Sequence, residues 1–122
     1  MTDKLLLDTN AVIYALQGAL HINELLERRN LHLSFITEIE LYSWPVLKPD
    51  DQRLIRNFIS SCQILEYSFP LKKRVIEIRK NYKLKMADAF IAATAIQYDI
   101  PLVSADVVFN KVTGINFIKI NL

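Results

Sequence analysis

Residues 5–10 have the sequence LLLDTN, in which a short apolar run ends at Asp8. An apolar run bounded by polar residues is typical of a buried β-strand, and an aspartate directly after it is well suited to begin a helix. Further segments place an acidic residue at the same kind of junction: ITEIELYS with Glu40, KMADAFIAATA with Asp88 and LVSAD with Asp106. The recurrence predicts a chain in which strands and helices alternate.

The rest of the chain continues this alternation. Apolar runs predict strands at residues 4–7, 31–36, 62–67, 102–103 and 116–120. Apolar stripes with helical spacing lie between them, formed by Leu54, Ile55, Phe58 and Ile59 and by Leu71, Val75, Ile78 and Tyr82. An alanine-rich helix is predicted at residues 87–98, before Pro101. We therefore expect an α/β fold, a three-layer α/β/α sandwich around a central five-stranded parallel sheet.

Composition favours one domain spanning residues 1–122, because 52% hydrophobic residues are enough to form a core at this length. No apolar run approaches the roughly 20 residues of a membrane helix, and the start MTDKLLLDTN lacks the features of a secretory signal. A lone cysteine, Cys62, excludes an internal disulfide and fits a cytoplasmic location. The net charge of +2 neither requires nor excludes a polyanionic partner.

The four acidic residues are expected to meet in space. The carboxyl ends of parallel strands share one edge of a sheet, where open α/β folds bind their ligands. Acidic side chains gathered there raise each other's pKa, and a cation relieves that cost. Oxygen ligands suit Mg²⁺ or Mn²⁺, and such ions activate water for attack on phosphodiesters. The pattern therefore indicates metal-assisted hydrolysis at a site formed by Asp8, Glu40, Asp88 and Asp106.

Each acidic residue also has an ordinary structural explanation. Asp8 and Asp106 are placed to cap the helix that follows them. Thr37 and Glu40 match a capping box, in which the glutamate reaches back to the backbone of the threonine. Asp88 falls in the first turn of a helix, where the helix dipole favours negative charge. Capping is served equally well by serine, threonine or asparagine, so four acidic residues are more than capping requires.

Basic residues cluster upstream of Asp88, with only Glu77 among them to balance their charge: Lys72, Lys73, Arg74, Arg79, Lys80, Lys83 and Lys85. A cluster of this kind can hold the phosphate backbone of a nucleic acid. The residues at 72–74 are equally well explained as the solvated face of a helix. The residues that lead into Asp88 are therefore the better candidates for holding such a backbone: Arg79, Lys80, Lys83 and Lys85.

The order LLLDTN, SFITEIEL, MADAFIAATA and LVSAD resembles the PIN domain family, and especially the ribonuclease toxins of VapBC-type toxin–antitoxin pairs. The similarity covers nearly the whole chain. It implies that the family's metal-binding acids correspond to Asp8, Glu40, Asp88 and Asp106. It also implies that Asn10 corresponds to the polar residue that commonly follows the first aspartate and supports the site. Glu38 falls on another helix face. The resemblance implies Mg²⁺- or Mn²⁺-dependent cleavage of RNA, a homodimer, and inhibition by a small VapB-like antitoxin laid over the acidic cleft.

Two alternatives stay open. Members of the family often carry another acid two residues after the last aspartate, whereas here Val107, Val108 and Phe109 follow Asp106. A catalytically silent PIN-like module that binds RNA or a protein partner is therefore the second hypothesis. A third is another α/β fold that uses Asp8 as a phosphate acceptor. The DTN sequence argues against it, because a haloacid-dehalogenase-like phosphatase needs aspartate at position 10 and a receiver domain needs an acidic pair beside the first strand.

Overall fold

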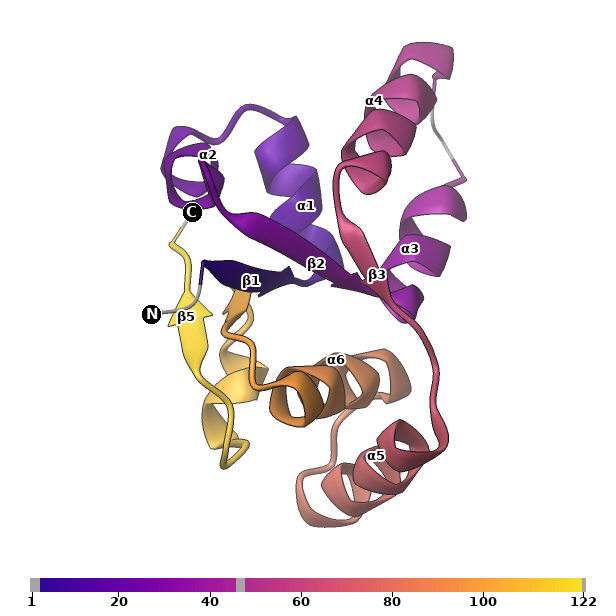
Figure 1. Cartoon of the computed structure of the whole chain (residues 1–122), viewed down its shortest axis with the longest axis vertical. Coiled ribbons are helices and arrows are strands. Elements are labelled where there is room, and N and C mark those ends of the chain that lie inside the picture. The colour runs from indigo at the N-terminus through magenta and orange to yellow at the C-terminus, as the bar shows by residue number, and fades with distance from the viewer. Residues whose placement is uncertain (1–2, 46–47, 122) are drawn as a thin grey trace.

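A computed structural model describes residues 3–45 and 48–121 and contains a five-stranded sheet (Figure 1). The strands are β1 (Lys4–Leu7), β2 (Asn30–Ser34), β3 (Gln63–Leu65), β4 (Leu102–Ser104) and β5 (Phe117–Lys119). All neighbouring strands are parallel, and their order in the sheet is β3-β2-β1-β4-β5. The predicted parallel α/β fold is confirmed, with β1 at the centre of the sheet.

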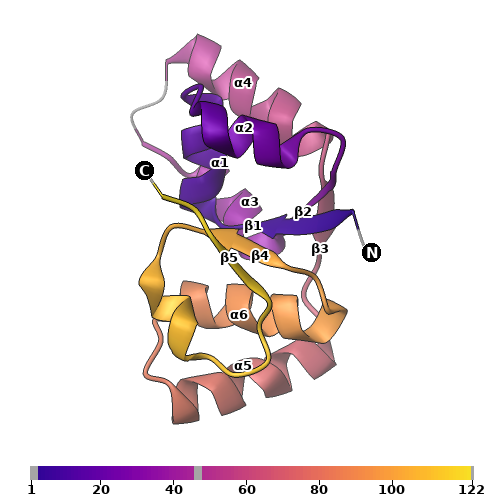
Figure 2. The ribbon, with the colours of Figure 1, turned by 90° about the vertical axis from the view of Figure 1, so that its left-hand side faces the viewer.

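Helices cover both faces of this sheet and make the predicted three layers (Figures 1 and 2). One face is covered by α1 (Thr9–Leu16), α2 (Leu20–Leu26), α3 (Phe35–Tyr42) and α4 (Pro49–Ser60). The other is covered by α5 (Phe69–Asn81), α6 (Met86–Tyr98) and a short 3₁₀ helix, η1 (Val107–Lys111). Within the described part of the chain, none of the helices has the length and apolar character needed to cross a membrane.

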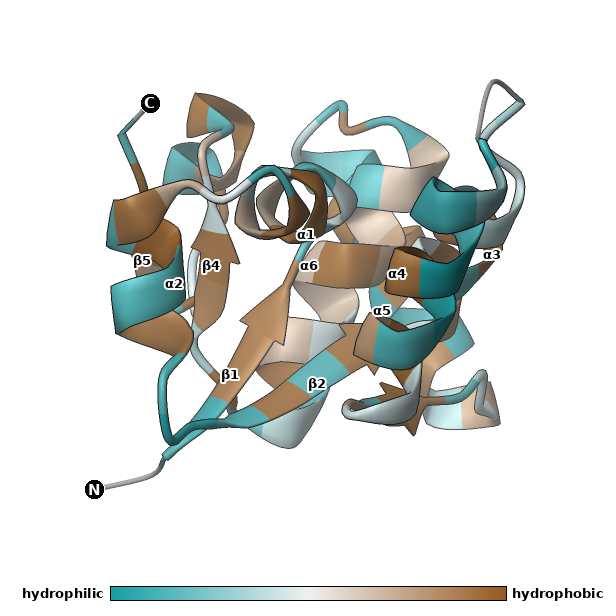
Figure 3. Cartoon of the chain, turned by 90° about the horizontal axis from the view of Figure 1, so that it is seen from above, coloured by the Kyte–Doolittle hydropathy of each residue, from teal (hydrophilic) through white to brown (hydrophobic). Residues whose placement is uncertain are grey.

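The central strand β1 connects the two halves of the core. Its residues Leu5, Leu6 and Leu7 are fully buried, because helices pack against both faces of the strand. Leu5 and Leu7 belong to the apolar cluster on the α1 and α4 side, whereas Leu6 belongs to the cluster on the α5 and α6 side. Figure 3 shows the hydrophobic colour along β1 and β4, with hydrophilic residues on the outer turns of α4.

Several predicted strands extend too far, including the one at residues 116–120, where β5 is Phe117–Lys119. The sequence predicts a strand through residue 36, but β2 ends at Ser34 because this residue is the N-cap of α3. Its hydroxyl accepts a hydrogen bond from the Ile36 N–H at 3.2 Å, so the chain passes from strand to helix without a loop. The strand predicted at residues 62–67 is also shorter, since β3 contains only Gln63–Leu65.

The alanine-rich helix α6 lies between the sheet and α5, and the predicted helix at residues 87–98 is confirmed. Ala89, Ala92 and Ala93 are fully buried, and their small side chains let the helix approach its neighbours closely. The helix ends at Tyr98, and its C-cap Asp99 has a left-handed φ of 52°, shortly before Pro101. This packing fixes the first turn of α6, and with it Asp88, beside the carboxyl edge of the sheet.

We expect Ala92→Leu to destabilise the protein by about 1–3 kcal/mol, because added methyl groups have no room in a closely packed interior. Urea denaturation followed by circular dichroism measures the change in the free energy of unfolding. Tyr98→Leu, at an exposed position of the same helix, is the control and should change that free energy by less than about 0.5 kcal/mol. Equal stabilities for the two variants would show that α6 does not depend on its alanines.

Candidate functional site

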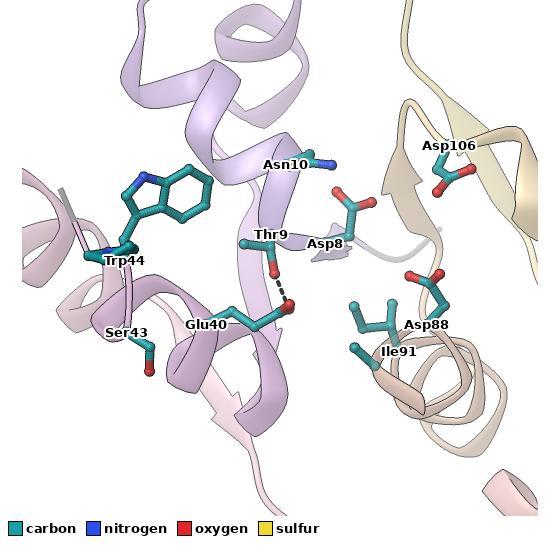
Figure 4. A pocket seen from close by; sticks show the side chains of 11 residues that line it. Asp8, Thr9, Asn10, Glu40, Ser43, Trp44, Asp88, Ile91 and Asp106 are labelled. Carbon is teal, nitrogen blue, oxygen red and sulfur yellow. Dashed lines mark hydrogen bonds between the residues drawn. The ribbon is translucent and has the colours of Figure 1, made fainter. Parts of the chain in front are cut away.

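A pocket of about 350 Å³ opens at the carboxyl edge of the sheet. Its lining consists of Asp8, Thr9, Asn10, Glu40, Ser43, Trp44, Pro45, Ala87, Asp88, Ile91 and Asp106. Asp8, Asp88 and Asp106 project into one space, and Glu40 faces it from α3 (Figure 4). The structure thus brings the four acidic residues predicted from the sequence, and also Asn10, to the same pocket from four separate parts of the chain.

Asp8 is anchored at the end of β1. One carboxylate oxygen accepts a hydrogen bond from the Ala11 N–H at 2.9 Å, which makes Asp8 the N-cap of α1. The other oxygen accepts a hydrogen bond from the hydroxyl of Ser104, the last residue of β4. Burial raises the pKa of Asp8 above its ordinary value, and the charges of Asp106 and Asp88 add to this shift, whereas the two hydrogen bonds oppose it.

Asp106 and Asp88 form the opposite wall of the pocket. Asp106 is the N-cap of η1 and accepts a hydrogen bond from the Val108 N–H at 2.9 Å, while its own N–H donates to the Ser104 hydroxyl oxygen at 3.0 Å. Asp88 lies in the first turn of α6. Burial raises the pKa of Asp88, the charges of Asp106 and Glu40 raise it further, and the nearby Lys85 partly offsets them. The acidic side chains therefore repel one another across the pocket.

Glu40 does not lie at the start of a helix, as the sequence predicts, but near the end of α3. The capping-box interpretation is wrong, because the N-cap is Ser34 and Thr37 is a buried residue inside the helix. The Thr37 hydroxyl has no hydrogen-bond partner among the described residues. The carboxylate of Glu40 instead accepts a hydrogen bond from the Thr9 hydroxyl at 2.6 Å, which directs it to the pocket (Figure 4).

The predicted RNA-binding cations do not line the acidic pocket. Arg79 and Lys80 line a separate apolar groove on α5 and α6, where the Arg79 guanidinium contacts the sulfur of Met86 at 3.7 Å. Lys85 precedes α6 as its N-cap residue, close enough to act on the charge of Asp88. Lys83 is exposed in the turn between α5 and α6. Of the four cations, Lys85 is the one whose charge acts on an acid of the pocket.

The donor chemistry of the pocket fits a hard divalent cation, because its titratable side chains are all carboxylates and Asn10 adds an amide oxygen. A cation would also relieve the repulsion that raises the pKa of Asp8 and Asp88. The side chains do not stand ready around one ion, however. Within residues 3–45 and 48–121, no three His, Cys, Asp or Glu side chains are grouped so that they could hold a metal. Coordination of one ion by three or more of these carboxylates therefore requires side-chain movement.

Sequence reasoning does not single out two hydroxyl residues of the pocket region, Thr9 and Ser104. Each donates a hydrogen bond to one of the predicted acids, Thr9 to Glu40 and Ser104 to Asp8. Their position in the sequence could have identified them as part of the site, since Thr9 directly follows Asp8 and Ser104 precedes Asp106 by two residues. Which acid each hydroxyl contacts depends on pairing between distant segments, and local sequence does not encode it.

The chain is similar to known proteins over nearly its whole length. The sequence profile of the PIN domain family matches residues 5–115. Similar solved structures include a toxin–antitoxin complex from Klebsiella pneumoniae, with 28% identity, a TM-score of 0.78, and 91% of this chain and 94% of that chain covered. DNA-bound VapBC from Salmonella typhimurium has 26% identity, a TM-score of 0.83 and 98% of both chains covered.

VapBC2 from Rickettsia felis, bound to a DNA fragment from its promoter, has 21% identity and a TM-score of 0.85, with 97% of this chain and 99% of that chain covered. At this identity the likeness shows a shared fold alone. No curated protein sequence matches the chain significantly.

We expect Asp8→Asn to raise the melting temperature of the metal-free protein at neutral pH. The pKa of Asp8 is raised in the folded state, so the folded protein holds this proton more tightly than the unfolded chain does. The metal-free protein therefore gains stability as the pH falls through the raised pKa and loses it as the pH rises. Asparagine removes the charge and is an equally good N-cap.

Thermal unfolding in EDTA between pH 8 and pH 5 measures this effect, and the gain on acidification should be smaller in Asp8→Asn than in the wild type. Glu24→Gln, on the exposed surface of α2, is the control for loss of a negative charge away from the pocket. A lower melting temperature for Asp8→Asn would mean that the Asp8 charge stabilises the fold.

Proposed function

Because this chain belongs to the PIN domain family, we propose that it is a Mg²⁺- or Mn²⁺-dependent endoribonuclease that hydrolyses RNA phosphodiester bonds. The observation that carries the proposal is the pocket itself, in which carboxylates from four distant segments face one another. Repulsion between them is relieved by a bound cation, so a site of this composition is suited to binding one. The family relationship identifies nuclease chemistry as the use of such a site.

In this proposal the metal is held by Asp8, Glu40, Asp88 and Asp106. When bound, a divalent ion supplies Lewis acidity, which activates water for attack on phosphorus and stabilises the leaving oxygen. The protein's part is to orient the reacting groups. Asp8 and Asp106 are fixed by their capping hydrogen bonds at the strand ends, and Asn10 positions Asp8 or a water in the pocket.

The RNA backbone is proposed to approach from the α5 and α6 side, where Arg79, Lys80, Lys83 and Lys85 supply positive charge. Lys85 lies next to the first turn of α6 and offsets part of the negative potential at Asp88. Cations at the mouth of an acidic pocket attract phosphates that the carboxylates alone would repel. The acidic pocket therefore binds RNA through its metal and through these neighbouring side chains.

We further propose that the chain is the toxin of a VapBC-type pair, a cytoplasmic homodimer inhibited by a VapB-like antitoxin. The similar toxin–antitoxin complex from Klebsiella pneumoniae and VapBC from Salmonella typhimurium support a partner of this kind. An apolar groove of about 210 Å³ between α1 and α4 also supports it, since Leu54 is half exposed there beside Ile13 and Leu16. Trp44 lines both this groove and the acidic pocket, so a segment bound in the groove would extend toward the acids.

A catalytically silent module that binds RNA or a protein is the second candidate function. It is favoured by the dispersed arrangement of the carboxylates, which form no ready ligand group among the described residues. The apolar Val107 and Val108, which begin η1 directly after Asp106, also favour it. Metal binding separates the two candidates, because a ligand that binds only the folded state raises its melting temperature.

We expect wild-type protein to be stabilised by millimolar Mn²⁺ and to cleave RNA in a manner that EDTA abolishes and added Mn²⁺ restores. Glu40→Gln should lose about 100-fold or more in cleavage rate, because it removes one of the carboxylates proposed to hold the metal that stabilises the transition state. Glu38→Gln is the matched control, since Glu38 lies on the same helix but does not line the pocket. It should cleave like the wild type.

The readouts are single-turnover cleavage of several labelled RNAs and the melting temperature with and without Mn²⁺. A wild type that Mn²⁺ neither stabilises nor activates would support the silent module. Equal rates for Glu40→Gln and Glu38→Gln would remove Glu40 from the site.

A further inference from the structure

Glu40 is held in the pocket by a different kind of contact from the two capping aspartates. Asp8 and Asp106 each accept a hydrogen bond from a backbone N–H near their own position, at 2.9 Å in both cases. Glu40 projects from near the end of α3, inside the helix and away from its N-terminus. Its carboxylate oxygen Oε1 accepts a hydrogen bond from the Thr9 hydroxyl at 2.6 Å, across 31 residues of sequence (Figure 4).

The contact matters because Glu40 is exposed and its side chain is long. An exposed glutamate samples several rotamers, and fixing it in one costs conformational entropy. A hydrogen bond to an ionised carboxylate is stronger than one between neutral groups. The bond from the Thr9 hydroxyl therefore offsets part of the entropy cost of ordering Glu40 before any ligand binds. Threonine is a stiff donor, since its branched Cβ restricts rotation. The bond occupies Oε1 and leaves Oε2 for other partners.

Among the residues that the structure describes, the Thr9 hydroxyl has no hydrogen-bond partner besides Glu40. Thr9 is the first residue of α1, but the N-cap of this helix is Asp8, which already accepts the Ala11 N–H. Threonine is also a poorer helix former than alanine, so helix stability does not favour it at this position. The side chain lines the acidic pocket and is directed across it at α3.

The orientation of Glu40 has an electrostatic consequence on the far wall. The charge of Glu40 contributes to the raised pKa of Asp88, so the carboxylate is held where it acts on that residue. Thr9 carries no charge itself, but by orienting the Glu40 carboxylate it affects the negative potential that acts on Asp88.

We propose that Thr9 is a positioning residue for the metal site, which holds the Glu40 carboxylate toward the pocket through its hydroxyl. The inference rests on the proposed metal-dependent function. Hydrogen-bond partners of metal-ligating carboxylates orient the ligand, and their loss typically weakens metal affinity by about 10–100-fold.

The test compares Thr9→Val, which keeps the shape and removes the hydroxyl, with Thr9→Ser, which keeps the hydroxyl. Mn²⁺ is titrated into purified full-length protein, and the apparent dissociation constant is taken from the rise in melting temperature. We expect Thr9→Val to bind Mn²⁺ about 10-fold or more weakly than the wild type, and Thr9→Ser to bind within a few-fold of it. Ser43→Ala is the matched control, because it removes another hydroxyl from the lining of the same pocket.

A second readout isolates the contact. Glu40→Gln is combined with Thr9→Val, and the double variant should bind Mn²⁺ no more weakly than Glu40→Gln alone, because Thr9 acts through Glu40. Additive losses would overturn the inference, as would equal weakening by Thr9→Ser and Thr9→Val. Melting temperatures in EDTA identify any variant that fails to fold, in which case Thr9→Ala replaces Thr9→Val.

If the wild type binds Mn²⁺ and Thr9→Val binds it equally well, the role of Thr9 is overturned and the proposed nuclease function stands. If the wild type does not bind Mn²⁺, the metal-dependent function and the role of Thr9 are overturned together.

Discussion

The parallel register of β1 with β2 and β4 is the constraint on which the pocket depends. Leu7 pairs with Leu33 on one side and with Val103 on the other. The residues that come next therefore lie at the same level of the sheet edge, and all of them are polar and buried: Asp8, Ser34 and Ser104. Each begins or supports the turn that follows, so a shift of one residue in either pairing would separate the groups that face the pocket.

Asp8 and Asp106 are N-caps, and this structural role offsets part of the repulsion between the carboxylates at the carboxyl edge of the sheet. Asp8 begins α1 and Asp106 begins η1, and the hydrogen bonds from the Ala11 and Val108 N–H groups offset part of the repulsion between carboxylates. Capping and ligand binding are therefore not competing explanations for these residues. The same geometry that satisfies a helix terminus aims a carboxylate oxygen at the edge of the sheet, where a cation can use it. The capping hydrogen bonds of Asp8 and Asp106 serve both stability and function. The buried negative charge lowers the stability of the metal-free protein but is needed to bind a cation.

Sequence patterns predict the strands, their parallel arrangement and the alanine-rich helix, because these depend on local periodicity and on the connection rules of parallel sheets. They misplace Glu40, since a threonine followed three residues later by glutamate has the same letters inside α3 as in a capping box. The direct passage from β2 to α3 at Ser34 leaves no turn residues that would mark the true boundary. The hydrogen bonds of Thr9 and Ser104 are invisible for another reason, since each joins segments that meet only in the folded chain.

Trp44 is the single tryptophan of the chain, and it stands on the wall of the acidic pocket with 41% of its surface exposed. Indole emission depends on the polarity and mobility of the surroundings of the ring. The whole fluorescence signal of the protein under tryptophan excitation thus originates beside the carboxylates and the α1–α4 groove. Binding at the acidic pocket or in the groove should therefore change the emission of Trp44, which can be measured without an added fluorescent label and without background from a second tryptophan.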